Sequence, residues 1–249
     1  MKLSIVMPAI RRNKWVNVYN SIQLDFAWEL IIVSPYDLPP ELPRKNIKYF
    51  QDFGSPMRAS CIGANLAEGK YLTWIADDGL PYSNTINKAV QILDNDINGR
   101  LVVVTKYLEA CTEVHPDWYY QLNVAYPKTP FIPDEWKIFN TAFMHREYYE
   151  TLGGWDSQFE TTAVGHADLA NRAQRDGCAV NLIQDPLLNC EHMPGTSGDH
   201  APIYFAHTEH DENLYKKIYN DPSCIHRTRI DINNWKKQPH IWRRRFSAL

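Results

Sequence analysis

The stretch that decides the fold is Tyr71-Leu72-Thr73-Trp74-Ile75-Ala76-Asp77-Asp78-Gly79. Its apolar start has the length and composition of a buried β-strand, and that strand runs directly into two carboxylates. In an open parallel sheet, ligands bind at the carboxyl ends of strands. Neighbouring carboxylates repel one another unless a cation shares them. Asp77 and Asp78 therefore indicate either a Mg²⁺ or Mn²⁺ site or, since Asp-Asp-Gly-Leu-Pro also favours turns, a tight turn.

The segments on either side alternate strands with helices. Leu3 to Met7 and Leu30 to Val33 are strand-sized apolar runs, and the helical spacing of apolar residues over 15–22 lies between them. Strand, helix and strand over about thirty residues form a βαβ unit with parallel strands. We expect further strands at 47–50, 101–105, 138–144 and 180–183, and helices at 58–67, 86–93, 168–175 and 212–219. The predicted class is α/β with a mostly parallel central sheet.

Composition excludes several kinds of protein. The chain has 249 residues, of which 44% are hydrophobic, and a formal net charge of −3, so disorder is not indicated. No apolar run approaches the roughly 20 residues of a membrane-spanning helix. The five cysteines include no Cys-x-x-Cys pair, which argues against a zinc knuckle. The apolar start is interrupted by Pro8 and is too short for a signal peptide, so we expect a cytoplasmic protein.

Three segments together resemble family 2 glycosyltransferases. They are Ser4 to Pro8, Gly54 to Asp78, and Leu152 to Phe159 followed by Asp168-Leu169-Ala170-Asn171-Arg172. The resemblance spans about residues 3 to 192. It implies a GT-A (Rossmann-like) domain over 1–220 with a C-terminal extension over 221–249. It also implies sugar transfer, with inversion, from a UDP- or GDP-linked donor to a saccharide or lipid-linked acceptor.

The resemblance implies a metal site. The family's Asp-x-Asp motif falls on Ala76-Asp77-Asp78, so its first aspartate is missing. Asp78 aligns with the metal-binding second aspartate, and Asp77 takes the intervening position. Members of the family often supply a third ligand after the last strand, which indicates His192; a structural histidine is the alternative. The cofactor implied is Mn²⁺ or Mg²⁺.

The resemblance also implies donor-binding residues. Pro8 and Ala9 would line the nucleotide pocket through backbone contacts. Ser34 stands at the family's base-binding aspartate and carries no charge to select a base. Arg58 could contact the pyrophosphate or the base, or lie solvated on the surface.

Two residues are candidates for the general base. The family places acidic residues before its Asp-Leu-x-x-Arg helix, and here His166 stands where the usual base aspartate would be, with Asp168 two positions later. Either could deprotonate an acceptor hydroxyl. The structural alternatives are a helix N-cap for Asp168 and a plain loop position for His166.

The C-terminal extension is basic. From His226 to Leu249 there are seven Lys/Arg and one acid, a charge of +6, which leaves −9 on the remainder. Trp235, Trp242 and Phe246 interleave with these cations. The tail could bind nucleic acid, contact a membrane surface peripherally, or pack on the acidic body. The acidic body argues against nucleic acid as a partner.

Two other functions remain open. A nucleotidyltransferase also presents carboxylates to a metal-bound nucleotide, but it would show a glycine-rich signature after the first strand, and residues 9–14 contain no glycine. The missing first aspartate also fits a catalytically degenerate nucleotide-sugar-binding domain.

Overall fold

A computed structural model describes residues 1–109, 112–114, 137–191 and 196–248. Its strands are β1 (Leu3–Pro8), β2 (Trp28–Ser34), β3 (Ile47–Gln51), β4 (Tyr71–Trp74), β5 (Gly79–Pro81), β6 (Leu101–Glu109), β7 (Thr112–Val114), β8 (Ala142–His145) and β9 (Ala179–Cys190). Its longer helices are α1 (Trp15–Ser21), α2 (Pro56–Asn65), α3 (Ser83–Asp94), α5 (Arg146–Thr151), α6 (Thr162–Arg175), α7 (Ala201–Ala206) and α8 (Glu212–Tyr219). Shorter turns are η1 (Gly198–His200), the π-helical η2 (His207–Asp211), η3 (Pro222–His226) and η4 (Asn234–Lys237).

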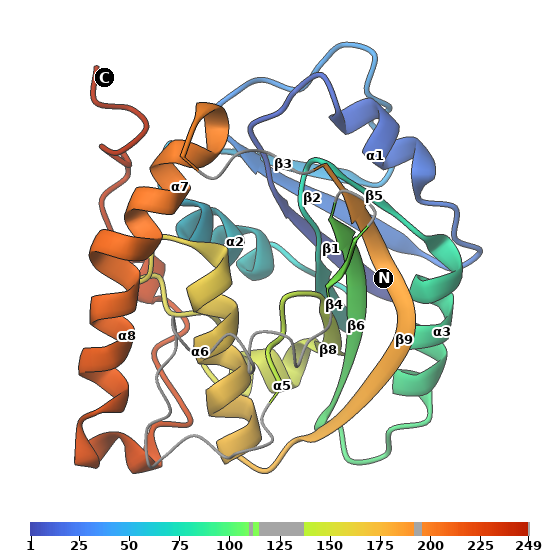
Figure 1. Cartoon of the computed structure of the whole chain (residues 1–249). Coiled ribbons are helices and arrows are strands. Elements are labelled where there is room, and N and C mark those ends of the chain that lie inside the picture. The colour runs from blue at the N-terminus through green and yellow to red at the C-terminus, as the bar shows by residue number, and fades with distance from the viewer. Residues whose placement is uncertain (110–111, 115–136, 192–195, 249) are drawn as a thin grey trace.

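One sheet in the order β3-β2-β1-β4-β8-β6-β9-β5 forms the centre of the molecule, and β7 pairs with β6 (Figure 1). The pairs β3–β2, β2–β1, β1–β4 and β6–β9 are parallel. β8 runs antiparallel between β4 and β6, and β5 runs antiparallel beside β9. The βαβ unit and the α/β class predicted from the sequence are confirmed.

Helices cover both faces of the sheet because its strands are apolar on both sides. Along β1, Leu3, Ile5 and Met7 join a core with α1 and α3, whereas Val6 faces the opposite core. That second core packs against α2, α6 and α8 (Figure 1). This is the layered arrangement expected when a parallel sheet buries near-continuous apolar runs.

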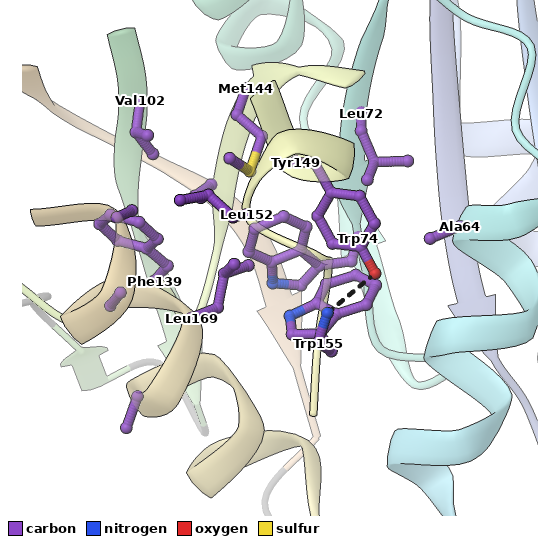
Figure 2. Packing of buried hydrophobic residues seen from close by; sticks show 14 of the residues in the cluster. Ala64, Leu72, Trp74, Val102, Phe139, Met144, Tyr149, Leu152, Trp155 and Leu169 are labelled. Carbon is purple, nitrogen blue, oxygen red and sulfur yellow. Dashed lines mark hydrogen bonds between the residues drawn. The ribbon is translucent and has the colours of Figure 1, made fainter. Parts of the chain in front are cut away.

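The core between the sheet and α6 is aromatic. Trp155 is only 1% exposed and lies edge-on to Trp74 and Tyr149, with ring centroids 4.9 and 5.0 Å away. Figure 2 shows this packing and the hydrogen bond that the Trp155 backbone N–H donates to the Tyr149 hydroxyl, 3.1 Å long. Trp155 therefore occupies a core position, while Trp74 extends to the site described below.

Helix α6 begins earlier than the sequence predicted. The expected start was residue 168, but the helix starts at Thr162. Within the added turn, a Cβ at Gly165 would lie 2.4 Å from Met57 Sδ, so the glycine allows α6 to pack closely against α2. Asp168 is therefore in the helix interior and is not an N-cap.

The C-terminal segment packs on the body. The Trp242 N–H donates to the Phe53 carbonyl over 2.8 Å, and Arg244 forms ion pairs of 2.7 Å with both Glu160 and Glu209. The interpretation that the basic tail packs on the acidic body is confirmed for these residues. Among the described residues, no helix is long and apolar enough to cross a membrane.

Candidate active site

A cavity of about 490 Å³ opens at the carboxyl edge of the parallel strands. Its walls come from residues that follow β1, β2, β3 and β4, from the first turns of α2 and α6, and from the C-terminal segment. Ligands of open α/β sheets bind at this edge, and a volume of this size is typical of small-molecule sites. The cavity is therefore the candidate active site.

Asp77 holds the loop after β1 in place. One of its oxygens accepts hydrogen bonds from the backbone N–H groups of Ile10 and Arg11, at 2.7 and 2.6 Å, and the other accepts from Arg11 Nη1 at 2.6 Å. The residue is 2% exposed. Both oxygens are thus already engaged by protein donors, and this arrangement leaves Asp77 poorly placed to ligate a metal.

Asp78 is the carboxylate that lines the cavity with little protein support. Its nearest cation is Arg11, whose Nη1 lies 3.8 Å from Asp78 Oδ2. Burial raises the pKa of Asp78, and the neighbouring charge of Asp77 adds to this effect, although Arg11 opposes it. The charged form of Asp78 is therefore penalised in the free protein, and an added cation would relieve that penalty.

The described residues contain no ready-made set of metal ligands, so a divalent cation at the cavity would need further ligands from a bound molecule. Among them, no three His, Cys, Asp or Glu side chains converge on one point. Mg²⁺ is commonly held by one or two carboxylates together with substrate phosphates, and Asp78 supplies one such ligand. His192 lies outside the described residues; among those described, His166, His200 and His207 line the cavity.

The cavity wall contains two of the residues predicted to bind the donor. Pro8 and Ala9 both line the wall. Ser34 is 1% exposed, and its hydroxyl accepts a hydrogen bond of 3.0 Å from the Tyr36 N–H. It is not among the lining residues, whereas Asp52, after β3, is among them. The sequence prediction did not include Asp52, because the short strand before it ends in polar residues without a motif.

Arg58 anchors the C-terminal segment. It is 2% exposed, its Nε lies 3.1 Å from both oxygens of Asp52, and its other nitrogens contact the Trp235 carbonyl and His240. It does not line the cavity. The structure therefore favours neither of the predicted alternatives, a donor contact or a solvated arginine. Arg58 instead connects α2 to the tail.

Asp168 lies in a buried ionic cluster behind the cavity wall. It pairs with Arg172 at 2.8 Å and with Arg227 at 3.4 Å, and it accepts a hydrogen bond of 2.5 Å from the Tyr219 hydroxyl. Burial alone would raise the pKa of Asp168, but the two arginines hold it below its ordinary value. The side chain is fully buried and does not line the cavity, so an acceptor hydroxyl cannot reach it in this conformation.

His166 does line the cavity, from the first turns of α6. Its ring packs against two tryptophans that also contact each other, with centroids 5.2 Å from Trp74 and 5.7 Å from Trp155. Burial lowers the pKa of His166 to about 3, so the imidazole is neutral at physiological pH. Of the two residues predicted as the base, only His166 is at the cavity.

Three residues of the cavity wall have a buried polar atom without a hydrogen-bond partner in the described part of the chain. These atoms are Arg11 Nε, Asn140 Nδ2 and His166 Nε2. Buried polar atoms in native proteins are nearly always hydrogen-bonded. Their concentration along one cavity is expected where a polar ligand completes the site.

No protein-family model matches this sequence, and no curated protein matches it. Among solved structures, the chain is similar to residues 1–349 of TarS from S. aureus. It has a TM-score of 0.58 and 13% identity over 95% of this chain and 89% of that one. The complexes of TarS 1–349 with UDP and with UDP-GlcNAc have TM-scores of 0.55 and 0.56 at 15% and 14% identity.

The match to the UDP complex covers 78% of this chain and 61% of TarS 1–349, and the match to the longer TarS structure covers 37% of that protein. The match to the UDP-GlcNAc complex covers 83% of this chain and 64% of the other. The chain thus spans less than two thirds of these proteins in most matches. At such low identity the likeness shows the fold alone, and that fold is the GT-A-like α/β fold predicted from the sequence.

Proposed function

We propose that this protein is a glycosyltransferase that uses a nucleotide-diphosphate sugar as donor. The observation that carries the proposal is the cavity at the carboxyl edge of the sheet, with Asp78 at its wall and three unpartnered polar atoms around it. The fold shared with TarS, a protein solved with UDP and UDP-GlcNAc, supports a uridine diphosphate sugar as the first donor to test.

The proposed reaction is a single displacement with inversion. The acceptor hydroxyl oxygen attacks the anomeric carbon, the bond from this carbon to the diphosphate oxygen breaks, and the hydroxyl proton passes to a base. His166 is the cavity residue we assign as that base. Its pKa of about 3 makes it weak in the free protein, and the negative charge of a bound diphosphate would raise that pKa.

Asp78 is the residue we assign to the metal, and Asp77 the one that orders the loop carrying Arg11. A divalent cation held by Asp78 and the diphosphate would stabilise the charge of the leaving group. Asp168 connects α6 to Tyr219 of α8 and to Arg227 of the segment after η3.

The test is a screen of UDP- and GDP-sugars for donor hydrolysis and transfer in the presence of Mn²⁺. We expect hydrolysis of at least one donor, lost in Asp78→Ala. The matched control is Asp185→Ala, because Asp185 is exposed and pairs with Lys88 away from the cavity. Binding without turnover of any donor would indicate a nucleotide-sugar-binding domain. Release of pyrophosphate from a nucleoside triphosphate would indicate a nucleotidyltransferase.

A further inference from the structure

The C-terminal tail forms part of the wall of the candidate active site. Trp242, Arg245 and Phe246 line the cavity together with residues that follow β1 and β4. Phe246 lies edge-on to Phe53, with ring centroids 5.6 Å apart, and the Trp242 indole N–H donates to Glu160 over 2.8 Å. These contacts hold a segment from the end of the chain against the edge where the sheet binds ligands.

Arg245 brings a positive charge that no carboxylate of the described residues neutralises within ion-pair distance. One of its terminal nitrogens donates to the backbone carbonyl of Asp199, and its guanidinium lies 5.5 Å from the Trp242 ring centroid. Burial lowers the pKa of Arg245; the charge of Asp199 opposes this effect, and the charge of Arg11 adds to it. On balance the pKa is lowered, so the folded protein disfavours this cation.

Arg11 also lies close to Asp199. Its Nε lies 3.7 Å from the Asp199 carboxylate, and this nitrogen has no hydrogen-bond partner. Asp199 therefore lies between the two arginines, with its side chain toward Arg11 and its carbonyl toward Arg245. The charge of Arg11 acts unfavourably on Arg245, and Asp199 offsets part of that effect. A bound anion that accepts from both guanidinium groups would be attracted by both charges.

We infer that Arg245 of the tail and Arg11 of the loop after β1 together bind the diphosphate group of the donor. The inference rests on the proposed function. A guanidinium presents paired N–H donors that match phosphate oxygens, which a lysine in the same place would not do. Because Asp77 fixes both the backbone and the side chain of Arg11, that half of the site is preorganised. The tail supplies the other half.

The experiment compares UDP with uridine, because the two probes differ only in the diphosphate. Affinities for wild type, Arg245→Gln and Arg245→Lys are measured by calorimetry for UDP and by ligand-observed NMR for uridine. We expect Arg245→Gln to weaken UDP binding by about tenfold to a hundredfold, the usual effect of losing a hydrogen bond to a charged group. Uridine affinity should stay within twofold, and Arg245→Lys should fall between wild type and Arg245→Gln for UDP.

Two controls separate a direct contact from a loosened tail. Arg243→Gln removes an exposed tail arginine outside the cavity wall and should leave UDP affinity unchanged. Arg244→Gln weakens the ion pairs to Glu160 and Glu209 that fasten the tail. Its effect, if any, should fall equally on uridine and UDP. Unchanged UDP affinity in Arg245→Gln, or an equal loss for both probes, would overturn the inference while leaving the proposed function standing. Failure of the wild type to bind either UDP or GDP would overturn both.

Discussion

Asp77→Asn should lower the free energy of unfolding, whereas Asp78→Asn should not. Asp77 accepts three short hydrogen bonds, two from backbone N–H groups and one from the Arg11 guanidinium. In Asp77→Asn one of the two acceptor oxygens becomes an NH₂ group that faces a donor, and the ion pair with Arg11 is lost. Removing one partner of a buried ion pair typically costs about 3–5 kcal/mol, and we expect a loss of this size in the free energy of unfolding.

Asp78→Asn should have no such cost. The burial that raises the pKa of Asp78 shows that the folded protein disfavours its charged form. The neutral amide removes that penalty, so the free energy of unfolding should be unchanged or higher. Donor hydrolysis should nevertheless be lost, because the amide cannot replace the carboxylate as a metal ligand.

The assay is guanidinium chloride unfolding at pH 7.5, followed by tryptophan fluorescence and by circular dichroism to test for two-state behaviour. Donor hydrolysis is measured on the same samples below the unfolding transition. The reasoning is refuted if Asp77→Asn costs less than about 1 kcal/mol, since three hydrogen bonds to a buried charge cannot be worth so little. It is equally refuted if Asp78→Asn destabilises the fold as much as Asp77→Asn does.

Three further results are expected. His166 has a folded pKa of about 3 against 6.5 in the unfolded chain. The stability that the neutral imidazole contributes is therefore intact above pH 6.5 and is lost as the pH falls below that value. Between pH 7.5 and 5, the free energy of unfolding should fall by about 2 kcal/mol more in wild type than in His166→Gln. Equal losses in the two proteins would argue against a buried neutral imidazole. Gly153→Ala should destabilise more than Gly177→Ala in thermal unfolding. Both glycines have φ of +83°, but only at Gly153 would a Cβ lie 1.9 Å from the Ile230 carbonyl oxygen. A similar loss of stability in the two variants would mean that the segment containing Ile230 can shift to make room for the methyl group. Calorimetry should show weak Mn²⁺ binding to the free protein and tighter binding with UDP present, an effect absent in Asp78→Asn; tight binding of Mn²⁺ alone would indicate a preformed site instead.

The sequence predicted the local elements well where apolar patterns are strong. The βαβ unit from Leu3 to Val33 and the strand before Asp77 appear as expected. Pro8 and Ala9 reach the cavity because Pro8 ends a parallel strand and Ala9 follows it, and the strand itself could be predicted from the sequence.

The sequence was less informative where a role depends on which distant group lies nearby. Asp168 and Arg58 carry the charges expected of a base and a phosphate contact. However, Asp168 is paired with Arg227 and accepts a hydrogen bond from Tyr219. Arg58 is paired with Asp52 and donates to the Trp235 carbonyl of the tail. These partners are 50 or more residues away in most cases, with separations of 59, 51 and 177 positions for Arg227, Tyr219 and Trp235. No local pattern indicates them.

The sequence by itself determined the α/β class, the βαβ unit at the N-terminus and the edge where a ligand would bind, because strand and helix periodicity is a local property of the chain. Only the tertiary structure decided how the two carboxylates that follow β4 differ. Both residues line the cavity, but Asp77 accepts hydrogen bonds from the loop after β1, whereas the cation nearest to Asp78 is 3.8 Å away. The tertiary structure also places Arg245 of the C-terminal tail in the same cavity wall as Arg11. Burial and charge pairing depend on groups that meet only after folding, and those two quantities decide what each side chain can do.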